Sequence, residues 1–166
     1  DGVTNNTVLV ISPLEGESKK LPTEIYLRNS FLYDDGAWAL TRCIHRNSHI
    51  ELMDLSNNNI SDEGMMAVAE ACKSLLALKT LKLNSNGFSF DGCRYLSTTY
   101  KSSDNLHTLE LCANRIADDG AEEISKILNH HRSLKILRLD GNYIGDDGVT
   151  ALGKCMQNNN TLEVLS

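Results

Sequence analysis

A spacing of 28 residues organises most of this chain and restricts its fold more than any other feature. With Leu106 as position zero, the stretch 106–120 has apolar residues at +3, +5 and +10, Asn at +8, Asp at +12 and Gly at +14. The same frame starts at Ile50, Leu78, Leu134 and Leu162, and extends with weaker matches back to Pro22. A fixed period of about 20–50 residues is the signature of stacked repeat units. The sequence therefore predicts a solenoid with units starting near 22, 50, 78, 106 and 134, and a sixth begun at 162.

The first half of each unit has the pattern of a short strand. Apolar residues alternate with other residues, as expected for a strand with one buried face. The alternating pairs are Ile25/Leu27, Met53/Leu55, Leu81/Leu83, Leu109/Leu111 and Leu137/Leu139. Asn follows at Asn58, Asn86, Asn114 and Asn142, with Ser30 in the first unit. Because an Asn side chain both donates and accepts, a stack of them can satisfy backbone groups where each strand bends.

The second half of each unit is predicted to be helical. Positions +18, +21 and +22 lie on one helix face. They read Leu40/Cys43/Ile44, Val68/Ala71/Cys72, Ile124/Ile127/Leu128 and Leu152/Cys155/Met156. Asp34, Asp62, Asp118 and Asp146 precede these segments and are expected to cap the helix that each one begins. In the third unit Phe90 replaces this Asp and Thr99 and Tyr100 lie on the inner face, so we expect its helix to be the least regular.

Strands and helices joined head to tail at this period predict an α/β solenoid. The parallel sheet would lie inside and the helices outside, and the wider helix layer would bend the stack into a right-handed β-α horseshoe arc. Residues 1–21 do not fit the frame. Residues 7–11 have strand composition, so we expect 1–21 to form an N-terminal capping strand and linker, with the tail of an upstream domain as the alternative. The repeat domain would be 22–166, and we expect the natural chain to continue beyond Ser166 because the sixth unit has only begun.

The pattern LxxLxLxxNxIxDxG followed by an amphipathic helix resembles the ribonuclease-inhibitor-like class of leucine-rich repeats. That class includes NOD-like receptor sensor domains, ribonuclease inhibitor, Ran GTPase-activating proteins and some ciliary and actin-regulating proteins. The resemblance covers about residues 22–166. It implies an intracellular protein-interaction role, and the uniform 28-residue spacing is closer to the receptor and GTPase-activating branches than to ribonuclease inhibitor.

Composition excludes several other classes of protein. A formal charge of −6 without a Lys/Arg cluster argues against nucleic-acid binding, and the longest apolar run is too short to insert into a membrane. The five cysteines are odd in number and form no C-x-x-C pair, so we expect reduced, mostly buried thiols and a cytoplasmic location. No nucleophile–base pair, phosphate loop or metal cluster stands out from the repeat pattern. We therefore expect no enzyme activity and no cofactor.

The concave face of the sheet is the predicted partner-binding surface, formed by positions +2, +4 and +6. The central row at +4 reads Tyr26, Asp54, Lys82, Glu110 and Arg138, so its charges alternate in sign. These charges could form a ladder that pairs within itself, at roughly 0–1 kcal/mol per exposed pair, or a strip that docks a protein. The two readings are compatible. The flanking rows add Leu52 and Ile136 at +2, and Arg28, Asn84, Cys112 and Asp140 at +6.

A few residues outside the repeat pattern needed separate interpretation. Cys112 is the one thiol expected to face solvent; with only His107 nearby, an inert role is favoured. His130 and His131 are read as solvated loop residues and not as metal ligands. Arg115 is the only Arg at its loop position, a weak pointer to a GTPase-activating role.

The sequence thus predicts a protein-interaction module, most simply a sensing or scaffolding segment of a larger intracellular protein. One alternative is a regulator of a small GTPase. Another is a structural assembly element of a cilium or the cytoskeleton, which would bind through its convex helices.

Overall fold

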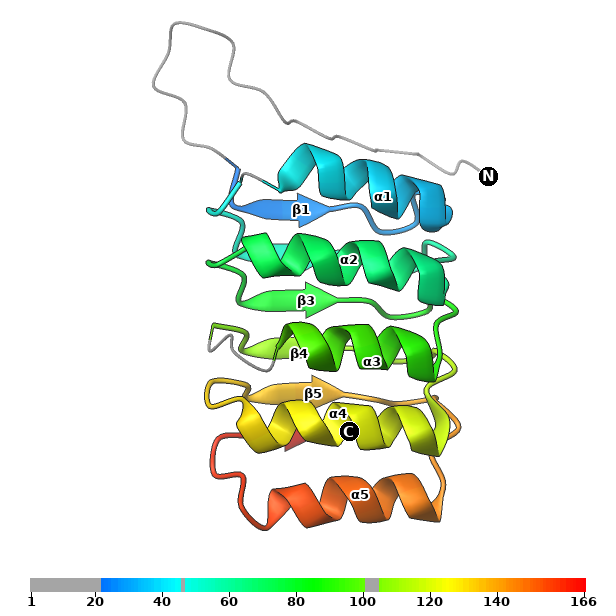
Figure 1. The fold of residues 1–166 in the computed structure, drawn as a ribbon, viewed down its shortest axis with the longest axis vertical. Helices are drawn as coiled ribbons and strands as arrows, with labels where there is room; N and C mark the ends of the chain where they lie inside the picture. The colour runs from blue at the N-terminus through cyan, green and yellow to red at the C-terminus, as the bar shows by residue number, and fades with distance from the viewer. Residues whose placement is uncertain (1–21, 46, 101–104) are drawn as a thin grey trace, which may run out of the picture.

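The structure, a computed structural model, describes residues 22–45, 47–100 and 105–166, and in these ranges strands and helices alternate strictly (Figure 1). The strands are β1 (Glu24–Tyr26), β2 (Leu52–Asp54), β3 (Thr80–Lys82), β4 (Thr108–Glu110), β5 (Ile136–Arg138) and β6 (Val164–Leu165). The helices are α1 (Tyr33–Ile44), α2 (Asp62–Ser74), α3 (Phe90–Thr99), α4 (Ala117–His130) and α5 (Asp146–Met156). The predicted strand at 7–11 lies outside the described residues.

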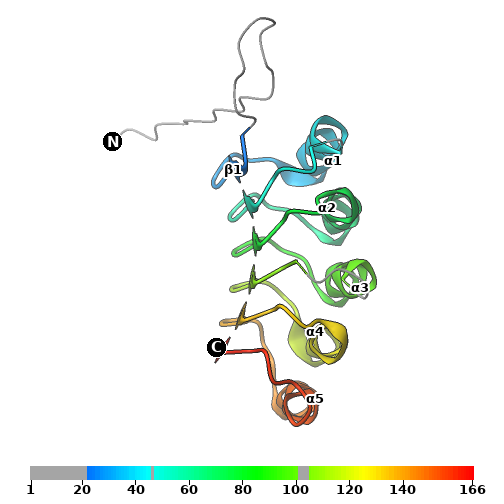
Figure 2. The ribbon, with the colours of Figure 1, turned by 90° about the vertical axis from the view of Figure 1, so that its left-hand side faces the viewer.

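The strands form one parallel sheet in chain order, and each residue pairs with its counterpart 28 positions away, as Ile25 does with Met53. All five helices lie on the same side of this sheet, and the rows of strands and helices bow in the same direction (Figure 2). The helices occupy the outer side of the arc, and no helix of the described residues covers the inner face of the sheet. This arrangement confirms the predicted α/β solenoid.

The core lies between the sheet and the helices. Every residue of the predicted strand pairs is buried, from Ile25 at the first strand to Leu139 after the fifth. The predicted inward helix positions are also mostly buried, because they share the face that meets the sheet. Cys43 is an exception: it is exposed, although the pattern placed it on the inner face of α1.

The predicted Asn stack is confirmed atom by atom. The Nδ2 of Asn114 donates to the carbonyls of Leu83 (3.0 Å) and Leu111 (2.8 Å), and its Oδ1 accepts from the backbone N–H of Asn86 (3.0 Å). Asn58, Asn86 and Asn142 make equivalent contacts. Each Asn therefore joins its own unit to the preceding one and satisfies backbone groups at the point where the chain leaves the strand.

The capping role predicted for the repeated Asp residues is wrong in one respect: Asp34, Asp62 and Asp118 each cap the helix of the next unit. Asp62 Oδ1 accepts from the backbone N–H groups of Ser89 (2.7 Å) and Gly92 (2.8 Å), at the start of α3. Asp34 binds the amides of Ser61 and Gly64 in the same way, and Asp118 binds those of Gly145 and Gly148. Each Asp lies in the first turn of its own helix, and its carboxylate reaches the free amides of the neighbouring helix, where a negative charge is stabilised.

This capping divides the loops into two forms. The helices α2, α3 and α5 receive an Asp from the preceding unit and begin at position +12. The helices α1 and α4 begin one residue earlier, at Tyr33 and Ala117, which have positive φ angles of 51°. For α4 the reason is Phe90, which replaces the Asp that would have capped it. The predicted irregularity of the third unit thus appears in two places: α3 is the shortest helix, at 10 residues, and the missing cap changes the start of α4.

Candidate functional site

On the inner face of the sheet, the opposite charges of Lys82 and Glu110 offset each other at the middle strands. Lys82 Nζ lies 3.2 Å from Glu110 Oε1, and Asn84 Nδ2 donates to Glu110 Oε2 at 2.8 Å. The Oδ1 of Asn84 in turn accepts from the backbone N–H of Cys112 at 2.8 Å. The alternating charges of the central row therefore do pair within the row at this point. The pair is partly exposed, so its own contribution to stability is only about 0–1 kcal/mol.

Asp54 is the member of the central row whose exposure was predicted wrongly from the sequence. It was expected to face solvent, but it is only 9% exposed and its Oδ1 accepts from the backbone N–H of Ser56 at 3.0 Å. A short carboxylate readily bonds an amide two residues further along the chain, where the strand ends. This local bond takes Asp54 out of the charge ladder. Its assignment as a partner-binding residue is therefore weakened.

At the C-terminal end of the face, Asp140 joins two neighbouring units. Its Oδ2 accepts from Ser166 Oγ at 2.8 Å and from Cys112 Sγ at 3.4 Å. These hydrogen bonds, that from Ser166 first, lower the pKa of Asp140 from its ordinary value. Burial, followed by the hydrogen bond to Asp140, raises the pKa of Cys112. A protonated thiol is the opposite of what a nucleophilic cysteine requires, and His107 Nδ1 lies 2.6 Å from the carbonyl of Asn105, within its own loop.

The remaining residues of the predicted surface lie toward its ends. Tyr26 is 57% exposed, with its hydroxyl donating to Glu24 Oε2 at 3.2 Å, and Arg28 is exposed beside it. Arg138 is exposed at the other end. Leu52 and Ile136 are half-buried and not fully exposed, because adjacent strands cover part of each side chain. A partner on this face would meet a neutral centre and accessible polar groups at both ends.

The structure separates the two adjacent histidines. His130 ends α4 and is exposed, with its Nδ1 2.8 Å from the carbonyl of Lys126, as expected for a solvated residue. His131 is 1% exposed, and its ring packs edge-on against Tyr100 with 6.1 Å between centroids. The prediction of a solvated His131 is wrong. The repeat frame could have shown this, since its counterparts Leu75 and Asn159 are both buried.

Arg115, the residue that pointed weakly to a GTPase-activating role, is exposed on the loop between β4 and α4. Its backbone N–H donates to the carbonyl of Phe88 at 3.0 Å.

Among residues 22–45, 47–100 and 105–166, no group of three His, Cys, Asp or Glu side chains is placed to hold a metal ion. No helix in these same ranges is both long enough and apolar enough to cross a membrane.

A family model described as Leucine Rich repeat matches residues 46–69, 102–125 and 130–153. Each match begins four residues before a frame start, at 50, 106 and 134, so the family model and the 28-residue frame are in phase. The fold is a leucine-rich repeat solenoid. The match does not specify the ribonuclease-inhibitor-like class.

One solved structure agrees with this assignment at the level of fold. The leucine-rich repeat solenoid is similar to leiomodin-1 actin-binding site 2, with a TM-score of 0.62 and 21% identity over 82% of each chain. It also matches an internalin, inlF, from Listeria monocytogenes with 27% identity and a TM-score of 0.45, over 67% of this chain and 28% of the internalin. No curated protein sequence gives a significant match.

Proposed function

We propose that this leucine-rich repeat solenoid is a non-enzymatic protein-interaction module whose partner binds the uncovered face of the sheet. The observation that carries the proposal is that the helices of the described residues all lie on the convex side of the sheet (Figure 2). Side chains of the other face, such as Tyr26 and Arg138, are exposed. A curved sheet of this kind is the usual binding surface of a solenoid.

The rigidity of the face supports the proposal. The Asn stack and the cross-unit Asp caps fix each unit to its neighbour through backbone groups. A partner therefore meets a preformed surface and does not have to order it, which lowers the entropic cost of association. The predicted binding set is retained, with Asp54 as its weakest member.

Actin is the first partner to test. The likeness to leiomodin-1 actin-binding site 2 is one of fold, so it does not by itself assign actin to this chain. It does favour the cytoskeletal role among the alternatives. Co-sedimentation with filaments and titration against monomeric actin would cover both forms of this candidate partner.

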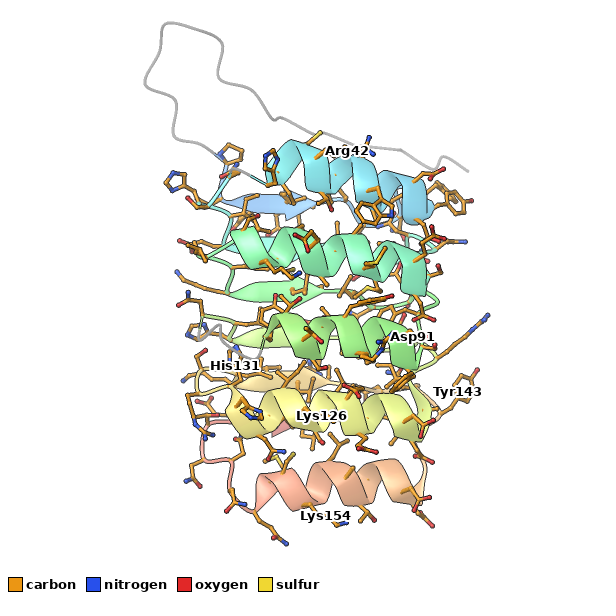
Figure 3. The ribbon with its side chains drawn as sticks, in the orientation of Figure 1. Arg42, Asp91, Lys126, His131, Tyr143 and Lys154 are labelled. Atoms are coloured by element: carbon orange, nitrogen blue, oxygen red, sulfur yellow. The ribbon has the colours of Figure 1, made fainter. Side chains whose placement is uncertain are left out.

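The central row is tested by charge reversal. Lys82→Glu and Arg138→Glu should together weaken actin binding by at least about tenfold, with an unchanged circular dichroism spectrum. Lys154→Glu is the matched control, since Lys154 projects from α5 on the helix side (Figure 3). If the control variant alone loses binding, the convex helices bind the partner. If the double variant binds as tightly as the parent, the central row has no role.

Two finer assignments belong to the proposal. A helix in every 28-residue unit supports the ribonuclease-inhibitor-like class, and five unpaired cysteines support a reducing compartment such as the cytoplasm. Regulation of a small GTPase is supported only by the exposed Arg115. Unaltered GTP hydrolysis by candidate GTPases in the presence of the chain would exclude it.

A further inference from the structure

Exposed aromatic side chains gather at one edge of the solenoid, where the chain passes from each strand to the following helix. We call this the loop edge and define it as positions +5 to +13 of each unit. Because all strands run in parallel, these loops and helix starts line up on one side, at the right of Figure 1. Of the Phe and Tyr side chains that are exposed in the described residues, all but Tyr26 lie there: Phe31, Tyr33, Phe90 and Tyr143.

The exposure of these rings does not depend on their place in the stack. Phe31 (60% exposed) and Tyr143 (81% exposed) occupy position +9 of the first and fifth units. Asn59 and Arg115, at the same position of the second and fourth units, are exposed too, although they have neighbouring units on both sides. Position +9 therefore points away from the core throughout the solenoid.

The fold gives no reason for an aromatic residue at +9. The φ angles of Phe31 and Tyr143 are 51° and 58°, in the left-handed region where a bulky side chain is strained. Asn59 has nearly the same φ angle, 56°, and Asn adopts this conformation more easily. An exposed ring also gains little from removal from water. Contact with another molecule would bury these rings and offset that cost.

The loop edge also carries one acidic residue per unit at position +13, and among positions +5 to +13 only Arg28 and Arg115 are basic. The carboxylates at +13 other than that of Asp91 are exposed and make no hydrogen bond or ion pair with the described residues. The helix dipole favours an acidic residue in a first turn. The row nevertheless gives the edge a negative potential beside its rings. The residues at +13 are Asp35, Glu63, Asp91, Asp119 and Asp147.

Asp91 shows which group this combination of carboxylate and ring binds. Arg94 Nη2 lies 2.7 Å from Asp91 Oδ1, and Arg94 Cζ lies 5.4 Å from the centre of the Tyr95 ring. A guanidinium suits both neighbours, because its planar fork donates to a carboxylate while its face stacks on an aromatic ring. In Figure 3, Asp91 and Tyr143 both lie at the loop edge, on adjacent sides of α4.

We propose that the loop edge is a docking surface for an extended, arginine-rich segment of a partner protein. The guanidinium groups of the segment pair with the carboxylates at +13 and stack on the exposed rings. Packed helices lie about 8–10 Å apart, so the carboxylates recur at about that spacing. Three residues of an extended chain span roughly 10 Å, so an Arg at every third position keeps step with the units. The inference is independent of the partner that binds the inner face of the sheet.

The test uses a labelled synthetic peptide of four Arg-Ser-Gly repeats and a matched peptide with Lys in place of Arg. Binding of each peptide to the full chain is measured by fluorescence anisotropy at low and at high salt. The Arg peptide should bind at least about threefold more tightly than the Lys peptide, because only a guanidinium combines the fork with stacking. Both affinities should fall as salt is added.

Replacement of the rings separates binding from stability. Phe31→Asn with Tyr143→Asn should weaken binding of the Arg peptide by about three- to tenfold, through loss of two stacking contacts. The same double variant should not lower the unfolding midpoint, because Asn accepts the left-handed conformation. Leu76→Asn is the matched control: Leu76 is exposed at the opposite edge, between α2 and β3, and its removal should leave binding within about twofold.

The charged residues provide a test in both directions. Asp35→Asn with Asp147→Asn should weaken binding of the Arg peptide and reduce its dependence on salt. Arg115→Ser should strengthen binding by about twofold or more, because it removes a competing cation from the edge.

Four results would each overturn the proposal. They are equal binding of the Arg and Lys peptides, unchanged binding by the ring variant, and a ring variant whose midpoint falls by more than about 4 °C. The fourth is concentration-dependent self-association of the parent chain that the ring variant abolishes, which would assign the loop edge to a second copy of the chain.

Discussion

Asn114→Ala tests whether the Asn stack holds the units together. Asn114 is 3% exposed, and its side chain bonds backbone groups of two units. The substitution removes one acceptor and one donor group from this buried site. Its cost depends on which of the groups bonded to Asn114 keep another partner.

The carbonyls keep a donor. Leu83 O also accepts from Asn86 Nδ2 (3.1 Å), and Leu111 O also accepts from Asn142 Nδ2 (2.8 Å). The N–H of Asn86 loses its acceptor entirely. One orphaned amide dominates the cost, so we expect a loss of about 1–3 kcal/mol in the free energy of unfolding.

Urea unfolding, followed by circular dichroism, measures this loss from the shift in midpoint at constant slope. Asn129→Ala is the matched control: Asn129 is exposed on α4, and its removal should change stability by no more than about 0.5 kcal/mol. Asn86→Ala should cost more than Asn114→Ala, because Asn86 Oδ1 accepts from two amides, those of Asn58 and Ile60. An Asn114→Ala midpoint equal to that of the control would refute the stack as a source of stability.

Two further predictions concern contacts between neighbouring helices. Burial by itself raises the pKa of Glu123, but hydrogen bonds from Lys126 (2.6 Å) and Ser97 (2.8 Å) outweigh it and lower the pKa below its ordinary 4.5. The stabilisation of the folded state by ionised Glu123 is therefore complete above pH 4.5 and is lost as pH falls through the lowered pKa. In urea titrations, Glu123→Gln should make the free energy of unfolding less dependent on pH between roughly pH 5 and 3. Phe90→Asp combined with Ala117→Ser should restore the missing cap of α4 and raise the calorimetric midpoint by about 2–8 °C. A double-mutant cycle with no coupling between those two substitutions would contradict the capping scheme.

Much of the fold followed from the 28-residue period. The strand pairs, the Asn stack and, apart from Cys43, the inward helix faces are as predicted, because each depends on alternation within one unit and on the stacking of equivalent residues. The candidate surface was predicted less completely. Its rows were identified, but the carboxylate of Asp54 bonds the backbone N–H of Ser56, and Lys82–Glu110 is the only ion pair among the described residues of the central row.

The 28-residue pattern shows which side chains recur, but the stacking of the units settles which unit each recurring side chain contacts. The period places Asp62 at the start of a helix, but Ser89 and Gly92, whose amides it binds, lie 27 and 30 residues further along the chain. Adjacent units lie one strand spacing apart, about 4.8 Å, so the nearest free amides belong to the neighbouring unit. The exposure of Cys43 has the same origin. It depends on which unit stacks beside α1, and that information is absent from the pattern within a single unit.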